Sequence, residues 1–470
     1  MRVEDTIVAV VTPPGRGGVG IVRLSGPDAR AMGQRLFSSP HADFAGFKPY
    51  RLHHGTLLDA TGRHLDDVLA AYMPGPGSYT GEDVVEFNCH GSPAILRALV
   101  GAALSLGARH AAPGEFTKRA FLAGRMDLSQ AQAVAELVAA DTLAGAGLAL
   151  SRLEGLMARR VGELRARLEG LRMSICLAVD FPEDEGECLD PPGFLAALTE
   201  VMDHMGLLIA AHGRARPFRE GELAVLAGPV NAGKSSLMNA LIGRERAIVC
   251  DVPGTTRDFL EEQLDLDGLP VRLVDTAGLR ETDDPVEREG LSHCARLLGE
   301  SRAVLLVVDG SRDFDPAELS VELSGALSGD CSFVSLDPVR TLAVVNKCDL
   351  PPAGRDPALV LAQAGFSVVR VSARTGHGLE DLCRTLRALL LGSDAAPPES
   401  EPVPNDRECA LLAQACDELA LLAADLQAGV PPDLLGVRLE IACGHLAAIT
   451  GEITPDGVLN AVFDGFCIGK

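Results

Sequence analysis

The sequence has 470 residues, 47% of them hydrophobic and 23% charged, which is typical of a soluble globular protein with more than one domain. Its formal net charge of −23 disfavours non-specific binding to nucleic acid, because no overall positive field attracts phosphate. The twelve cysteines contain no Cys-x-x-Cys pair, which argues against a disulfide scaffold and a zinc ribbon and favours a cytoplasmic protein with reduced thiols.

Residues 1–120 predict a small α+β domain, because short apolar runs such as TIVAVV and EDVVEFNCHG alternate with glycine and proline. The segment GRGGVG at 15–20 fits the dinucleotide pattern GxGxxG, but strand-like residues follow it where a helix is needed, so we do not expect such a site. We expect no signal peptide, and no window approaches the roughly 18 apolar residues of a membrane span.

From Leu128 onward, apolar residues recur at helical spacing, which predicts long amphipathic helices in residues 121–216. Residues 217–392 then alternate short apolar runs with helix-length segments, the pattern of a parallel α/β sheet. A proline-rich linker leads back to helices in residues 393–470. We therefore expect one helical domain, in two parts, with an α/β domain inserted into it.

The segment GPVNAGKS, residues 228–235, has the spacing of a phosphate-binding loop and lies between a strand and a helix. Its glycines allow backbone N–H groups to turn toward phosphates, and the helix N-terminus adds a positive end. Lys234 is expected to reach the outer phosphates, and the Ser235 hydroxyl to hold Mg²⁺.

Four further motifs follow in order: GTTRD, DTAG, NKCD and SAR. Thr256 is the natural second hydroxyl ligand of Mg²⁺, and Asp275 can hold the ion through water. Asp349 accepts hydrogen bonds only, so it matches the N1–H and amino donors of guanine and rejects adenine. Together these motifs predict a Ras-like GTP-binding domain.

One position departs from signalling GTPases. DTAG is followed by Leu279, where those proteins have the glutamine that orients the attacking water. Glu287 is the best-placed carboxylate downstream, although the residues alone slightly favour an exposed acid at a helix start.

The sequence resembles the MnmE (TrmE) family of tRNA modification GTPases over nearly its whole length. The resemblance is carried by TPPGRGGVGIVRLSG, YTGEDVVEFNCHG, PGEFTKRAFLAGRMDLSQAQAV, NAGKSSLMNAL, DVPGTTRD, DTAGLRETDDPVE and the terminal FCIGK. It implies a cytoplasmic homodimer of multidomain α/β fold, with an N-terminal tetrahydrofolate-binding and dimerisation domain (1–120), a helical domain (121–216 and 393–470) and an inserted G domain (217–392).

The family works with a flavin-dependent partner of the MnmG (GidA) type, forms a heterotetramer, and modifies carbon 5 of the wobble uridine of tRNA. It adds an aminomethyl or carboxymethylaminomethyl group. The implied cofactors are GTP, Mg²⁺, K⁺ and a 5-formyl- or methylene-tetrahydrofolate. Such a partner would supply much of the tRNA contact that the acidic chain lacks.

The resemblance also implies residue roles. The catalytic residues are Glu287, which activates water, and Cys467. Folate contacts fall on Arg23, Glu86, Arg125 and Lys470. Mg²⁺ contacts fall on Ser235 and Thr256. K⁺ contacts fall on Asn231, Cys250, Val252 and Thr255, beside the phosphates. The full set expected to bind GTP is Asn231, Ala232, Gly233, Lys234, Ser235, Ser236, Cys250, Asp251, Val252, Pro253, Gly254, Thr255, Thr256, Asp275, Thr276, Ala277, Gly278, Asn346, Lys347, Asp349, Ser372, Ala373 and Arg374.

Cys467 lies near the end of the sequence, in FDGFCIGK. The pattern excludes a prenyl anchor, and no second ligand lies at metal-binding spacing. A packed residue and a reactive thiol at a mobile terminus remain open, and the family resemblance favours the thiol.

Two other functions compete with tRNA modification. One is a regulatory GTPase that assembles ribosomes or binds RNA, and the other is a dynamin-like scaffold that uses G-domain dimerisation. Both leave the N-terminal blocks and the FCIGK tail unexplained.

Overall fold

The computed structural model describes residues 5–41, 44–180, 190–244, 260–275, 296–314, 336–392, 401–453 and 455–470. They fall in two compact units. The first comprises Met1–Ala139, Ala149–Ala210 and Pro402–Lys470, and the second Ala140–Leu148 and Ala211–Glu401.

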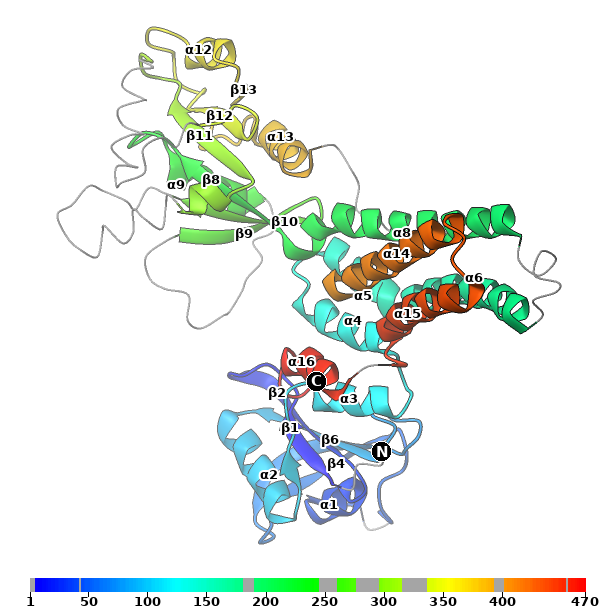
Figure 1. Cartoon of the computed structure of the whole chain (residues 1–470). Helices are drawn as coiled ribbons and strands as arrows, with labels where there is room; N and C mark the ends of the chain where they lie inside the picture. The colour runs from blue at the N-terminus through cyan, green and yellow to red at the C-terminus, as the bar shows by residue number, and fades with distance from the viewer. Residues whose placement is uncertain are drawn as a thin grey trace. The chain divides into compact units, whose positions relative to one another are not determined.

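A seven-stranded sheet forms the N-terminal part of the first unit, in the order β3-β4-β5-β6-β2-β1-β7 (Figure 1). Its strands are β1 (Ile7–Val10), β2 (Gly17–Ser25), β3 (Phe37–Ser38), β4 (Leu52–Leu58), β5 (His64–Met73), β6 (Val84–Gly91) and β7 (Arg109–His110). Neighbours are antiparallel except β1 and β7. The segment GRGGVG leads into β2, a strand, which confirms that it does not open a helix.

Alternation along the strands decides which face of this sheet is buried. Leu24, Val85 and Phe87 are fully buried and belong to the core that α1 (Ala29–Arg35) and α2 (Pro93–Ser105) cover. Their neighbours Arg23 and Glu86 point to the opposite face, because side chains alternate along a strand. The predicted α+β domain is confirmed.

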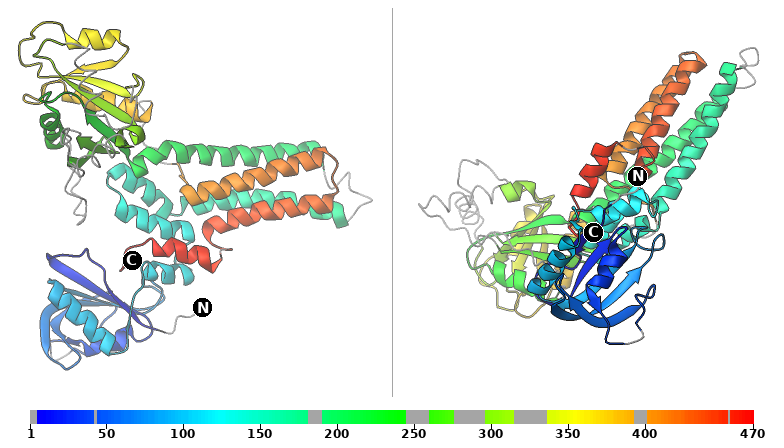
Figure 2. Two further views of the ribbon diagram at one scale, coloured as in Figure 1. Left: turned by 60° about the vertical axis from the view of Figure 1, so that its left-hand side comes forward. Right: turned by 90° about the horizontal axis from the view of Figure 1, so that it is seen from below.

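The helical part of the first unit is a bundle of long helices (Figure 2). Its elements are α4 (Leu128–Ala139), the end of α5 (Leu143–Leu153), α6 (Leu156–Asp180), α8 (Pro191–Glu220) as far as Ala210, α14 (Asp406–Gln427) and α15 (Pro432–Thr450). The short α16 (Asp456–Asp464) packs against α4 and the end of α3 (Glu115–Leu122). One apolar core joins α6, α8, α14 and α15, with Leu164, Leu198, Leu419 and Leu439 among its buried residues. The two helical stretches of the sequence therefore form one bundle, as expected.

A buried arginine also ties the two stretches together. Arg152 of α5 donates through Nη2 to Glu408 Oε1 of α14 at 2.9 Å, and it also pairs with Glu136 of α4. Glu408 in turn caps α14, in a reciprocal capping box with Asn405. The charge of Arg152 is thus matched inside the fold, which a buried cation requires.

Among the described residues, α8 is the one helix that is long and apolar enough to cross a membrane by length and composition alone. The most apolar 18-residue stretch of α8 is more apolar than we expected from the sequence, and 33% of that stretch is buried inside the structure. Leu198 and Met205 of α8 belong to the bundle core. Because core helices meet the same criterion, this is weak evidence for a membrane span.

The second unit is built on a six-stranded sheet in the order β13-β12-β11-β8-β10-β9. Its strands are β8 (Glu222–Ala227), β9 (Leu260–Leu266), β10 (Leu269–Asp275), β11 (Ala303–Asp309), β12 (Thr341–Asn346) and β13 (Ser367–Arg370), and its helices are α9 (Lys234–Arg244), α12 (Pro357–Gln363) and α13 (Leu379–Leu391). Only the β10–β9 pair is antiparallel. The parallel strands end at one edge of the sheet, where Asp275 ends β10 and Asn346 ends β12.

Candidate functional site

The phosphate-binding loop connects β8 to α9, and its two glycines are needed for steric reasons. Gly228 has φ +139°, and a Cβ there would lie 2.1 Å from the Val307 carbonyl oxygen. Gly233 has φ +93°, and a Cβ there would lie 2.4 Å from Asn346 Nδ2. The motif therefore has glycine at the two places where a side chain does not fit.

Three side chains converge at the start of α9. The buried Lys234 donates from Nζ to the carbonyl oxygens of Gly228 and Pro229 at 2.8 and 2.9 Å. Ser235 Oγ donates to Asp275 Oδ2 at 2.7 Å, which places a hydroxyl oxygen beside a carboxylate. Mg²⁺ prefers such oxygen ligands, so Ser235 and Asp275 fit the predicted ion.

The end of β12 connects the phosphate loop to the loop that follows β13. Asn346 donates through Nδ2 to the Ala232 carbonyl oxygen at 3.0 Å, and its Oδ1 accepts from the Ala373 amide at 3.1 Å. Lys347, in the left-handed region with φ +61°, donates from Nζ to the Asn231 carbonyl oxygen at 2.8 Å. Hydrogen bonds thus connect the described residues of the phosphate loop, the end of β12 and the loop after β13.

Asp309 belongs to the same site, although the sequence analysis missed it. It ends β11, and its Oδ2 lies 2.6 Å from Lys347 Nζ. Burial raises its pKa, but hydrogen bonds from Lys347 and Ser311 outweigh this, so the net shift is downward. The sequence could have indicated it, because Asp309 ends the buried run AVLLVVD. The two strands beside β11 also lead into the site, β8 into the phosphate loop and β12 into Asn346.

Asp349, the residue expected to recognise guanine, has two partners. Ser372 Oγ donates to its Oδ1 at 2.7 Å, and Arg374 Nη2 lies 2.7 Å from its Oδ2. The Ser372 hydrogen bond and the Arg374 charge hold the pKa of Asp349 below its ordinary value, so it stays ionised at neutral pH.

Several predicted residues lie outside the described part of the chain. They are Glu287 and ten residues expected at the nucleotide or its ions: Cys250, Asp251, Val252, Pro253, Gly254, Thr255, Thr256, Thr276, Ala277 and Gly278. Their roles stay predictions.

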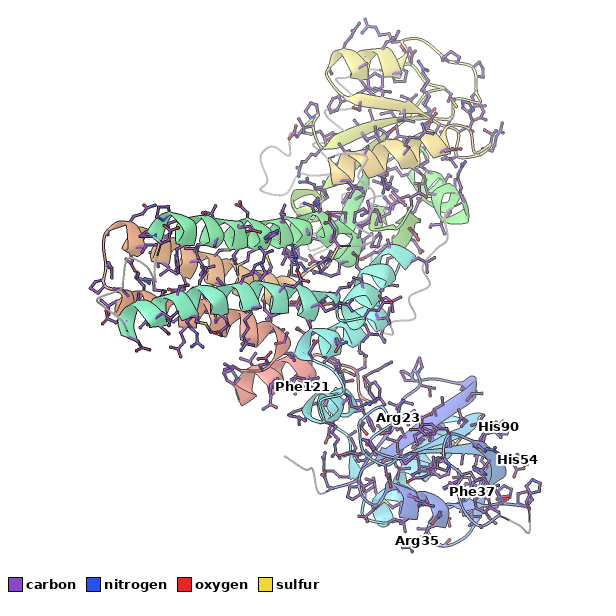
Figure 3. All side chains as sticks on the ribbon, turned by 90° about the vertical axis from the view of Figure 1, so that its right-hand side faces the viewer. Arg23, Arg35, Phe37, His54, His90 and Phe121 are labelled. Carbon is purple, nitrogen blue, oxygen red and sulfur yellow. The ribbon has the colours of Figure 1, made fainter. Side chains whose placement is uncertain are left out.

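In the first unit, Arg23 and Glu86 meet directly. The register of β2 and β6 places them opposite each other, and Arg23 Nε donates to Glu86 Oε1 at 2.6 Å. The guanidinium carbon of Arg23, which Figure 3 labels, also lies close to two aromatic rings. It is 5.4 and 5.5 Å from the ring centres of Phe116 and Tyr79. Two charged groups and two aromatic rings are thus gathered on the side of the sheet away from α1 and α2.

An ionic cluster supports this region. Arg119 of α3 (Glu115–Leu122) is buried and contacts Asp5, Glu115 and Glu82 at 2.7, 2.9 and 3.2 Å. Glu82 also accepts from Ser25 Oγ at 2.7 Å. Because the cluster joins β2, α3 and the segment before β6, it fixes the elements that carry Phe116 and Glu86.

The FCIGK tail is docked against the same region. The Lys470 amide donates to the Cys467 carbonyl oxygen at 3.3 Å, which closes a four-residue turn with Gly469, φ +100°, at its third position. The Cys467 carbonyl oxygen also accepts from the Gly114 amide at 3.4 Å, and the Phe116 amide donates to the Lys470 carbonyl oxygen at 3.1 Å. The tail is therefore tied to the start of α3, and the expectation of a mobile terminus was wrong.

Packing explains why the tail stays there. Phe463 and Phe466 are buried, and the ring centres of Phe121 and Phe463 lie 6.4 Å apart. Ile468 is 64% exposed and takes no part in this packing, and Cys467 is exposed as well. The aromatic side chains thus anchor the segment and leave the thiol accessible.

The four predicted folate positions lie around α3 and the segment before β6. Arg23 and Glu86 form an ion pair, and Lys470 bonds to the backbone of Phe116, over whose ring Arg23 lies. Arg125 is exposed, and its Cγ is 3.6 Å from where a Cβ of Gly81 would lie. The structure thus brings the first two into contact and joins Lys470 to Arg23 through Phe116, whereas Arg125 lies beside Gly81, before β6.

Comparisons with known proteins agree along the whole sequence. Residues 6–125 match the family described as "GTP-binding protein TrmE N-terminus", and residues 128–467 match the "MnmE helical domain". The tRNA modification GTPase MnmE of Nitratidesulfovibrio vulgaris (strain DP4) is 49% identical, with 100% of both chains covered. Those of Lawsonia intracellularis and Geobacter sulfurreducens are 43% and 40% identical, with 99% and 100% of this chain and 100% of each relative covered.

Among solved structures, the G domain of the T. maritima iron transporter FeoB aligns with 36% of this chain and 98% of its own at 24% identity. Its TM-score of 0.26 is too low to support an inference. The sequence relatives and the two family matches are decisive: the chain belongs to the MnmE family of tRNA modification GTPases, and it is a GTPase that acts in tRNA modification.

Proposed function

We propose that this GTPase acts with a one-carbon tetrahydrofolate and a flavin-dependent partner of the MnmG type to modify carbon 5 of the wobble uridine of tRNA. It works in the cytoplasm as a homodimer, and the partner supplies much of the tRNA contact. The relatives' shared name favours this role over a ribosome-assembly or a dynamin-like GTPase.

The observation that carries the folate proposal is the docking of the FCIGK tail on the backbone of Phe116 at the start of α3. The ring of Phe116 lies beside Arg23, which is paired with Glu86. Glu86 Oε2 accepts pterin N–H donors, while Oε1 remains bonded to Arg23. Arg125 and Lys470 bind the carboxylates of the glutamate tail. The rings of Tyr79 and Phe116 offer flat apolar surface beside them.

Cys467 is proposed as a functional thiol at this site. It is exposed, and the turn through Gly469 holds its backbone against the start of α3. Residues 1–120, the two helical stretches 121–216 and 393–470, and the insert 217–392 are proposed as the domain limits.

For GTP hydrolysis, Lys234 binds the outer phosphates, Ser235 and Thr256 hold Mg²⁺, and Asp349 selects guanine. Asn231, Cys250, Val252 and Thr255 bind K⁺, which supplies positive charge beside the phosphates in place of an arginine finger. Glu287 orients and activates the attacking water, since Leu279 has no polar group for that task.

The experiment that tests the proposal combines folate binding with tRNA analysis. Purified protein is titrated with 5-formyltetrahydrofolate, and tRNA from cells lacking the protein is analysed for wobble-uridine nucleosides after complementation with wild type or Cys467→Ser. We expect the serine variant to retain folding, dimerisation and GTP hydrolysis and to lose most of the modification.

Cys176→Ser is the matched control, because Cys176 is an exposed cysteine on α6, in the helical bundle. It should modify tRNA at the normal rate. Normal modification by Cys467→Ser would show that the thiol only packs, and absence of folate binding by the wild type would refute the N-terminal site.

A further inference from the structure

The carboxylate of Asp349 is engaged at both oxygens within the second unit. Oδ1 accepts from Ser372 Oγ at 2.7 Å, and Oδ2 lies 2.7 Å from Arg374 Nη2. The Asp349 side chain is 14% exposed, whereas that of Arg374 is 75% exposed. A sheltered carboxylate is thus paired with an arginine whose side chain reaches in from solvent.

The backbone around Arg374 is held in place. The Ala373 amide donates to Asn346 Oδ1 at 3.1 Å, and the Thr375 amide donates to Ser372 Oγ at 3.1 Å. The Gly376 amide adds a bond to the Ser372 carbonyl oxygen at 2.9 Å. Because the residues on both sides of Arg374 are fixed, its side chain can leave Asp349 without a change in the loop.

Lys347, the lysine of the NKCD motif, does not compete for this carboxylate. Its Nζ is bonded to Asp309 Oδ2 at 2.6 Å and to the Asn231 carbonyl oxygen at 2.8 Å. Within the described part of the chain, Arg374 is therefore the cation paired with Asp349.

Guanine presents to a carboxylate the N–H at N1 and the amino group at C2, which are bonded to one carbon and form a guanidine fragment. An arginine side chain offers parallel N–H donors of the same kind. Both groups are planar and bond best in the plane of the carboxylate, so they compete for the same side of Asp349 Oδ2. The Arg374 guanidinium thus occupies a position that the edge of guanine needs.

We propose that Arg374, which the sequence led us to expect among the residues that bind GTP, is instead an intramolecular competitor of guanine. Its guanidinium must leave Asp349 before the base can bind, so that Arg374 sets the affinity for GTP and the rate of its entry. The proposal rests on the proposed role of Asp349 in guanine recognition. Because Arg374 belongs to the same chain as Asp349, its guanidinium has a high effective concentration at the carboxylate.

The expected size of the effect follows from the exposure of Arg374. Exposed ion pairs are weak, so the pair is formed in only part of the molecules at any moment. If binding requires the open form, the apparent Kd rises by the reciprocal of the open fraction, here roughly two- to fivefold.

The test is the substitution Arg374→Met, which keeps an apolar stem and removes the guanidinium. We expect GTP and GDP to bind roughly two- to fivefold more tightly and to associate faster, as measured with a fluorescent guanine nucleotide in a stopped-flow instrument. The ratio of the two Kd values, mutant to wild type, should approach one as salt is raised, because salt screens the pair but affects phosphate binding equally in both proteins.

Arg370→Met is the matched control, since Arg370 lies on β13 and pairs with Asp356 instead. It should leave both Kd values unchanged. An equal or weaker affinity of Arg374→Met for GTP would overturn the proposal, the weaker case showing that Arg374 contacts the bound base.

Asp349→Asn separates failure of this inference from failure of the proposed site. In that background Arg374→Met should no longer improve binding of xanthosine triphosphate, because the carboxylate partner is gone. If Asp349→Asn leaves guanine affinity unchanged, the assignment of Asp349 fails. If it changes base preference while Arg374→Met has no effect, only the competitor fails.

Discussion

The nucleotide site and the tail site are assembled in different ways. In the nucleotide site, Asp275, Asp309 and Asn346 each end a strand of a largely parallel sheet, and such ends always share one edge. In the tail site, Arg23 and Glu86 meet through the register of an antiparallel pair. The FCIGK segment reaches the backbone of Phe116 because α16 and its phenylalanines pack against α3.

This difference predicts how each site fails. A substitution in the nucleotide site should act locally, on binding or hydrolysis of GTP. The tail site should also be sensitive to residues that touch no ligand, because several weak backbone contacts hold it together. The predictions below test that contrast, beginning with the largest expected effect.

Asp349→Asn should weaken GTP binding on the order of a hundredfold, because it places an amide donor against the donors of guanine. Affinity for xanthosine triphosphate should rise, and folate binding should be unaffected. Equilibrium titration with each nucleotide measures the change. Loss of folate affinity in this variant would break the expected independence of the two sites.

Exchange of K⁺ for Na⁺ should lower kcat for GTP hydrolysis at least about tenfold while leaving nucleotide affinity nearly unchanged. The ion is proposed to act in the transition state, at the place where an arginine finger acts in other GTPases. Steady-state hydrolysis in matched salts checks this. Equal rates in the two salts would refute the assignment of Asn231 and its neighbours to K⁺.

Gly469→Ala should disrupt the tail site alone. Gly469 has φ +100°, and a Cβ there would lie 2.5 Å from the Val10 carbonyl oxygen, so the docked turn is lost or strained by about 1–3 kcal/mol. Folate affinity should fall about tenfold, with normal GTP hydrolysis.

Gly465→Ala is the control for that substitution. Gly465 has φ −76°, and a Cβ there would lie 3.7 Å from its nearest neighbour, so alanine fits. Equal folate affinity in the two variants would show that the turn does not position the tail.

The smallest expected effect concerns pH. The hydrogen bond from Arg109 holds the pKa of Asp5 below its ordinary value; burial raises the pKa of Glu115, but hydrogen bonds from Arg109 and the Ala112 amide outweigh it. For carboxyl groups with lowered pKa values, the stabilisation is present above the unfolded pKa of about 4 and is lost as the pH falls through the folded values.

The free energy of unfolding of the N-terminal domain should therefore fall below pH 4. The loss should be less than about 1 kcal/mol per carboxylate, because the ion pairs are partly exposed. The chain has no tryptophan and only three tyrosines, Tyr50, Tyr72 and Tyr79, so tyrosine fluorescence follows this domain in the full-length protein. Arg109→Met should flatten the pH dependence between pH 6 and 3. An unchanged slope would mean that the pair contributes nothing.

The sequence by itself determined the GTPase domain and most of its site. Local chemistry requires glycine at 228 and 233 and polar residues after the buried runs. A parallel sheet then brings the ends of its strands to one edge, so no knowledge of distant contacts is needed to group these residues. The same reasoning missed Asp309, because a single aspartate after a strand has no motif around it.

Tertiary structure alone decided the remaining features. Nothing local in the sequence indicates that Arg374 pairs with Asp349. Nor does it indicate that Arg152 of α5 pairs with Glu136 of α4 and with Glu408 of α14, which follows the inserted domain in the sequence. The family resemblance named Arg23, Glu86 and the tail together. The pairing of Arg23 with Glu86 depends on strand register, and the docking of the tail depends on the burial of Phe463 and Phe466. Such contacts join residues far apart in the chain, and local sequence patterns carry no information about which distant residues will meet.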